Sequence, residues 1–182
     1  MKKTGNCGGA IKKSNRYQSG VFHPFEIAFC GYSGSGKTTL IEKVIATFSN
    51  KYSIGYVKHD VHGFQMDKEG KDTFRCSSAG AKGVYINHEH ISAFLDYRES
   101  EKYRQPLNFS EFDLVIVEGY KESSMPKILV LDRDQKILDD FKTGSFSNVI
   151  GIVGEHSAFD IDIPYFQRDN IHQIEKFILN YF

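Results

Sequence analysis

The stretch Phe25-Glu-Ile-Ala-Phe-Cys-Gly-Tyr-Ser-Gly-Ser-Gly-Lys-Thr-Thr39 decides how the rest of the chain is interpreted. It begins as an apolar run, passes through a glycine-rich turn and enters a helix-forming run at Lys37. Glycines adopt backbone dihedrals that other residues avoid, so such a turn can wrap an anion with its N–H groups. The stretch therefore predicts a strand, an anion-binding loop and a helix in succession.

Four residues of this stretch, Gly31, Gly36, Lys37 and Thr38, have the G-x-x-x-x-G-K-[ST] spacing of a P-loop. The helix, expected from Lys37 to about Phe48, directs the partial positive charge of its N-terminus at the bound anion. The ammonium group of Lys37 can reach the outer phosphates, and the hydroxyl of Thr38 is available to Mg²⁺. The sequence thus predicts a nucleoside triphosphate site.

A second motif follows a strand that is expected to be buried on both faces. The run Phe112-Asp-Leu-Val-Ile-Val-Glu-Gly-Tyr120 has four apolar residues in a row and ends in Glu118 and Gly119. P-loop proteins place an acidic residue at the end of such a strand, where it holds Mg²⁺ directly or through water. We expect Glu118 to do so; an exposed glutamate before a turn is the alternative. Lys37 and Glu118 are the candidate catalytic residues.

Strands and helices alternate along the rest of the chain. Strands are expected at residues 52–59, 84–86, 91–97, 112–120, 127–131 and 148–153, and helices at 73–79 and 171–182. Asp72 is expected to cap the first of these two helices, and Asp169 or Asn170 the second. The alternation predicts an α/β protein with the three-layer P-loop NTPase fold and a mostly parallel sheet.

Length and composition narrow the class of protein. We expect the 182 residues to form a flexible basic leader at 1–22 and one P-loop nucleotide-binding domain at 23–182. The 23 lysines and arginines balance the 23 aspartates and glutamates, so no net field attracts nucleic acid or an anionic membrane. The cysteines lack the spacing of a metal or redox site, and no apolar run is long enough to cross a membrane. A cytoplasmic protein is expected.

The segment from residue 58 to residue 72 is dense in charged residues and histidine, and it follows the second expected strand. Ligands of open parallel sheets bind beyond the carboxyl ends of the strands. We therefore expect this segment to face the same crevice as the P-loop. His59 and His62 have no further ligand at metal-site spacing, so a zinc site is not expected.

The motifs together resemble a known family. After the P-loop come, in order, Lys58-His59, His62, Asp67, Gly70-Lys71-Asp72, Ala79-Gly80-Ala81 and Val117-Glu118-Gly119-Tyr120-Lys121. From about Phe25 to its C-terminus the chain is similar to the molybdopterin-guanine dinucleotide biosynthesis protein B (MobB) family. This resemblance implies a homodimeric GTP-binding protein with weak GTPase activity. It also implies a role in assisting the partner enzyme MobA, which attaches GMP to molybdopterin.

The resemblance also implies roles for individual residues. Thr38 and Glu118 are expected near Mg²⁺. The phosphates of GTP are expected on Gly34, Ser35, Gly36, Lys37, Thr38 and Thr39, and the same crevice is expected to be lined by Lys58, His59, Lys71 and Asp72. The guanine preference rests on the resemblance alone, because no Asn-Lys-x-Asp motif follows an apolar strand. No glutamine or arginine can be assigned to orient water or to stabilise the transition state, so slow hydrolysis is expected.

Two other functions stay open on the sequence. A small-molecule kinase uses the same strand, loop and helix, but kinases commonly bring arginines over the phosphates, and only Arg98 and Arg104 lie close together in this sequence. The second alternative is an interaction module with a vestigial loop, whose behaviour Lys37→Ala would leave unchanged. Dimerisation is expected through the strands within residues 84–97, where an exposed edge can pair with its copy.

Overall fold

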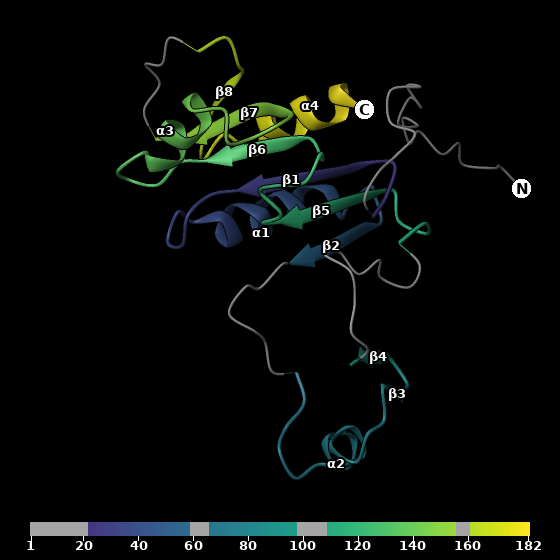
Figure 1. Cartoon of the computed structure of the whole chain (residues 1–182). Helices are drawn as coiled ribbons and strands as arrows, with labels where there is room; N and C mark the ends of the chain where they lie inside the picture. The colour runs from purple at the N-terminus through teal and green to yellow at the C-terminus, as the bar shows by residue number, and fades with distance from the viewer. Residues whose placement is uncertain (1–21, 59–65, 98–108, 156–160) are drawn as a thin grey trace, which may run out of the picture. The chain divides into compact units, whose positions relative to one another are not determined.

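The computed structural model of the protein describes residues 22–58, 66–97, 109–155 and 161–182 (Figure 1). Their contacts divide them into two compact units. Residues 22–58, 109–155 and 161–182 belong to the larger unit, and residues 66–97 belong to the smaller unit, which interrupts the larger one in sequence. This smaller unit was not predicted from the sequence. The boundary between a leader and a domain that begins at residue 23 stays a prediction.

The larger unit is built on one six-stranded sheet (Figure 1). Its strands are β1 (Glu26–Cys30), β2 (Ile54–Lys58), β5 (Leu114–Glu118), β6 (Lys127–Val130), β7 (Val149–Gly154) and β8 (Tyr165–Gln167). Their order across the sheet is β2-β5-β1-β6-β7-β8, and every neighbouring pair is parallel. All six carboxyl ends therefore lie at one edge of the sheet, where ligands of open parallel sheets bind.

Helices cover both faces of this sheet. Residues of α1 (Lys37–Phe48) and α4 (Ile171–Tyr181) belong to one hydrophobic core, and residues of α3 (Lys136–Lys142) belong to a second one. Successive residues of a strand point to opposite faces. Ile27 and Phe29 of β1 accordingly join the first core, whereas Ala28 and Cys30 join the second. Burial on both faces explains the continuous apolar runs of β1 and β5, and it confirms the predicted three-layer α/β fold.

A buried lysine fixes the turn that connects β5 to β6. The side chain of Lys127 is fully buried, and burial lowers its pKa. Its ammonium group donates hydrogen bonds to the backbone carbonyls of Ser123, Met125 and Ser147. Hydrogen bonds to these three acceptors offset the free-energy cost of removing the ammonium group from water. The lysine thereby ties the turn after β5 to the residues just before β7.

The smaller unit contains α2 (Asp72–Ser78) and an antiparallel hairpin of β3 (Gly83–His88) and β4 (Ile91–Asp96). The hairpin confirms the predicted strand pair, although β3 is longer than the sequence indicated, since Gly83 already pairs with Asp96. The prediction that Asp72 caps α2 is wrong. Lys71 occupies the cap position, and Asp72 lies in the first turn, where a negative charge favours the N-terminal end of the helix.

The last helix begins as predicted. Asn170 is the N-cap of α4, and its side-chain oxygen accepts a hydrogen bond from the backbone N–H of Gln173 at 3.2 Å. Among the described residues, no helix combines the length and the apolar character needed to cross a membrane.

Candidate functional site

The glycine-rich loop follows β1, a central strand of the sheet, and leads directly into α1. Gly36 has a φ of 77°, which lies in the left-handed region that favours glycine. α1 begins at the next residue without a side chain that caps its N-terminus. The first N–H groups of the helix are therefore left for a ligand in front of the loop, as a P-loop requires.

Lys37 folds back over this loop. Its Nζ donates a hydrogen bond to the backbone carbonyl of Tyr32 at 2.8 Å. Burial is the main cause that lowers the pKa of Lys37; the carboxylate of Glu118 opposes this effect, and the charges of Lys121 and Lys58 add to it. Lys37, Lys58 and Lys121, here called the lysine cluster, thus gather positive charge at one place, and an anion would relieve their mutual repulsion.

Glu118 lies at the carboxyl end of β5, and only 6% of its surface is exposed. This burial excludes the alternative of an exposed glutamate before a turn. Oγ1 of Thr38 lies 3.1 Å from both carboxylate oxygens of Glu118, and the hydroxyl of Tyr56 donates to Oε2 at 2.7 Å. Lys58 pairs with Glu118 in the register of β2 and β5. Hydroxyl and carboxylate oxygens are ligands that Mg²⁺ prefers, so Thr38 and Glu118 fit this ion.

The turn after Glu118 brings Lys121 to the loop. Gly119 and Tyr120 have φ values of 94° and 52°, and two successive residues in the left-handed region turn the chain sharply. Nζ of Lys121 then lies 3.9 Å from the centre of the Tyr32 ring, a cation–π contact with a P-loop residue. Lys121 belongs to a motif of the sequence, but no role for it could be predicted from that motif.

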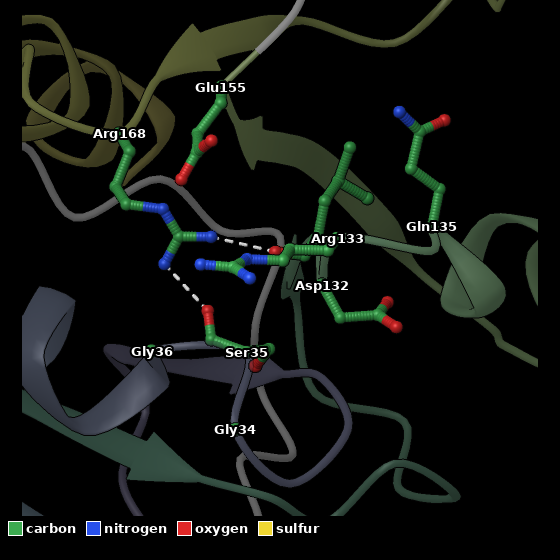
Figure 2. Close-up of a pocket in the computed structure, with 9 residues that line it drawn as sticks. Gly34, Ser35, Gly36, Asp132, Arg133, Gln135, Glu155 and Arg168 are labelled. Carbon is green, nitrogen blue, oxygen red and sulfur yellow. Dashed lines mark hydrogen bonds between the residues drawn. The ribbon is translucent and has the colours of Figure 1, made fainter.

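Arg168, which directly follows β8, holds the loop from the other side. Its Nη1 donates to the carbonyl oxygen of Ser35 at 2.6 Å, and its Nη2 donates to that of Leu131 at 2.7 Å (Figure 2). A Cβ atom at Gly36 would lie 2.5 Å from Nη1, so any other residue there would displace the guanidinium from its contact with the loop. The sequence gives no sign of this contact, because Arg168 lies 133 residues from Ser35.

A cavity of about 410 Å³ adjoins the loop. Its lining comes from the loop itself and from the segments that follow β6, β7 and β8, and consists of Gly34, Ser35, Gly36, Leu131, Asp132, Arg133, Gln135, Glu155 and Arg168 (Figure 2). In the sheet, β5 and β2 lie on one side of β1, and β6, β7 and β8 lie on the other. The cavity and Glu118 therefore flank the P-loop from opposite sides. Apart from the loop residues, none of the residues that line the cavity was predicted to belong to a site.

The predicted site residues fall into three groups. Residues 34–39, Lys58 and Glu118 all lie at the carboxyl edge of the sheet in the larger unit. Lys71 and Asp72 are exposed residues at the start of α2 in the smaller unit, and their approach to the P-loop stays a prediction. His59 lies outside the described residues.

We expect Arg168→Lys to loosen the loop, because a lysine cannot span both carbonyls as a planar guanidinium does. The substitution should lower the free energy of unfolding by about 1–2 kcal/mol and weaken nucleoside triphosphate binding about tenfold. Denaturant titration and equilibrium binding measure the two effects. The exposed Lys176 of α4 provides the control variant Lys176→Ala, which should change neither. Full triphosphate affinity in Arg168→Lys would contradict a bracing role.

Comparisons with known proteins agree with this geometry. A family model described as molybdopterin guanine dinucleotide synthesis protein B matches residues 26–155. A molybdopterin-guanine dinucleotide biosynthesis adapter protein of Haemophilus influenzae is 32% identical over 161 residues, which are 85% of this chain and 88% of the relative. A probable adapter protein of the same pathway from Bacillus subtilis is 30% identical over 159 residues, 82% of this chain and 90% of the relative.

Comparison with solved structures gives the same family. A crystal structure of molybdopterin-guanine biosynthesis protein B superposes with a TM-score of 0.63 and 25% sequence identity, over 86% of this chain and 98% of that chain. The family match covers both the P-loop and Glu118, and the relatives align over most of their length. The chain therefore belongs to the molybdopterin-guanine dinucleotide synthesis protein B (MobB) family.

Proposed function

We propose that this protein is a GTP-binding adapter in molybdopterin-guanine dinucleotide biosynthesis that binds GTP with Mg²⁺ and assists MobA. One observation carries the nucleotide part of the proposal: the P-loop, the Thr38–Glu118 contact and the lysine cluster meet at one edge of the sheet. The pathway is supported by the relatives, which are named as its adapter proteins. MobA is the partner that the family resemblance implies.

Each residue has a role that follows from its chemistry. The N–H groups of residues 34–39 bind the phosphates. Lys37 exchanges the Tyr32 carbonyl for the outer phosphates, which attract its charge more strongly. Thr38 and Glu118 hold Mg²⁺, and Tyr56 orients the Glu118 carboxylate. When bound, Mg²⁺ neutralises charge on the β- and γ-phosphates.

The same site favours slow hydrolysis. Both terminal nitrogens of Arg168 donate hydrogen bonds to backbone carbonyls. The arginine is therefore not available to stabilise the negative charge of a transition state. Lys58 and Lys121 instead add ground-state attraction for the γ-phosphate. A site that binds triphosphate well and cleaves it slowly suits an adapter, because the bound state then lasts long enough for a partner to recognise it.

The segment from residue 58 to residue 72 is the proposed link between nucleotide and partner. Its first residue, Lys58, pairs with Glu118 and so lies at the edge where the γ-phosphate is expected. Contacts from the γ-phosphate to Lys58, His59 and Lys71, and from its Mg²⁺ to the carboxylate of Asp72, would order residues 60–72 and alter the affinity for MobA.

We expect GTP with Mg²⁺ to change the affinity of the wild-type protein for MobA at least about fivefold. Lys37→Ala should abolish triphosphate binding and therefore also the effect of GTP on the affinity for MobA. Glu118→Gln should raise the Mg²⁺ concentration that this effect requires. Titrations of labelled MobA with and without nucleotide measure both effects. Lys43→Ala is the control, because Lys43 is an exposed residue of α1 that pairs with Asp169 at the surface. Identical MobA affinity in the presence and absence of GTP would refute the adapter mechanism.

A homodimer formed through the β3–β4 hairpin is part of the proposal. The hairpin exposes five large apolar side chains: Tyr85, Ile86, Ile91, Phe94 and Tyr97. By the register of the hairpin, Tyr85 and Phe94 share one face, and Ile86 and Ile91 share the other. Such a two-stranded ribbon is marginal alone, and exposed apolar side chains on both of its faces favour a partner. A second copy of this chain is the occupant that the family resemblance implies, and the strand edges can extend the pairing.

In sedimentation velocity the wild type should run as a dimer, and Ile91→Asp should run as a monomer. Ile91 is 72% exposed, so the substitution should leave the fold of the chain intact while placing a charge in the dimer contact. Glu89→Gln, a polar change in the same hairpin turn, serves as the control. A wild-type monomer at micromolar concentration, or a dimer that survives Ile91→Asp, would rule out this interface.

A further inference from the structure

We propose that the cavity beside the P-loop is the purine-binding half of the nucleotide site and that the carboxylates of Asp132 and Glu155 select guanine. This inference rests on the proposed nucleotide-binding function and adds the origin of its base specificity. The sequence lacks the Asn-Lys-x-Asp motif with which ordinary GTPases read guanine. Two carboxylates, each from a segment that follows a separate strand, provide the same kind of acceptor here.

The position of the cavity fits a nucleoside. It shares Gly34, Ser35 and Gly36 with the phosphate loop, whereas Thr38 and Glu118 approach each other on the opposite side of β1. A triphosphate whose outer end reaches Thr38 and Glu118 therefore leaves its nucleoside end at the cavity. The volume of about 410 Å³ lies within the range of roughly 300–1,000 Å³ that is usual for small-molecule pockets.

The distribution of charge separates the two halves of the site. On the phosphate side, the charges of Lys58, Lys121 and Glu118 all act on Lys37, so the lysines of the cluster outnumber this carboxylate. In the cavity, the positive charges of Arg133 and Arg168 are matched by the negative charges of Asp132 and Glu155. An anion gains more on the lysine side, so the charge-balanced cavity is suited to a neutral, polar group such as a base.

Residues of the cavity lining leave polar atoms without a hydrogen-bond partner, which favours a hydrogen-bonding ligand. Ser35 is only 3% exposed, yet its buried hydroxyl has no hydrogen-bond partner among the described residues. Within the same part of the chain, Oδ1 of Asp132 is also buried and unpartnered. Buried polar atoms normally have partners, because leaving them unpaired costs roughly 1–3 kcal/mol each.

A carboxylate distinguishes guanine from adenine because it only accepts hydrogen bonds. Guanine offers two adjacent donors, its N1–H and its 2-amino group. Adenine offers its 6-amino group next to an N1 lone pair, which a carboxylate oxygen would repel. Asp132 and Glu155 can thus be satisfied by guanine, whereas adenine would leave an acceptor unpaired at the cavity wall. The planar guanidinium of Arg133, an exposed lining residue, can stack on the base.

The test measures the affinities of GTP, ATP and XTP for the full chain and for Asp132→Asn, Glu155→Gln and the double variant. We expect the wild type to prefer GTP over ATP and the double variant to lose about 10- to 100-fold of that preference. At least one amide variant should also bind XTP more tightly than the wild type does. Xanthine carries a carbonyl in place of the 2-amino group, and an amide nitrogen can donate to it. Misfolding cannot produce this gain.

The control is Asp134→Asn, because Asp134 pairs with Lys136 at 3.3 Å and does not line the cavity. A double variant that keeps the wild-type ratio of GTP to ATP affinity would overturn the inference, as would a wild type that binds both equally. Either result still leaves triphosphate binding at the P-loop intact. Failure of the wild type to bind any triphosphate would instead refute the proposed function itself.

Discussion

The register between β1 and β5 is the constraint on which the site depends. Phe29 of β1 lies opposite Glu118 of β5, so the P-loop and the buried carboxylate leave the sheet side by side. This register places the hydroxyl of Thr38 3.1 Å from the carboxylate oxygens of Glu118. A shift of one residue would turn Glu118 to the other face of the sheet and destroy the contact. The apolar burial that fixes the strands therefore also fixes the chemistry.

Two basic residues extend this constraint to the loops. Lys127 holds the turn after β5 by donating to three backbone carbonyls, and Arg168 joins the P-loop to the end of β6. Both use positive charge to satisfy backbone carbonyls of the segments that connect the strands. The lysine cluster, in contrast, is held close together without a matching number of carboxylates. The larger unit thus separates structural cations from those that are available to a ligand.

How much could be read from the sequence depended on how local each feature is. The P-loop and the bounds of α1 follow from consecutive residues, and α1 runs over the predicted residues 37–48. The apolar run before Glu118 predicted a doubly buried strand, and β5 is buried along its whole length. β8, with three residues, is too short for a periodic pattern to reveal. α3 has seven residues, as α2 does, but it begins after Gln135, which is not a typical N-cap residue, so no start signal marks it.

Features assembled from distant segments could not be predicted in this way. The cavity combines the P-loop with residues that follow three other strands, and Arg168 reaches the loop only because β8 is parallel to β7 at the edge of the sheet. Its partners are backbone carbonyls, which leave no trace in side-chain spacing.

The most direct test of the two-sided site is a crystal structure with Mg²⁺ and a non-hydrolysable GTP analogue. Our account predicts phosphates on residues 34–39, Mg²⁺ between Thr38 and Glu118, and the purine beside Asp132 and Glu155. A purine on the Glu118 side of β1, or phosphates away from the loop, would contradict it.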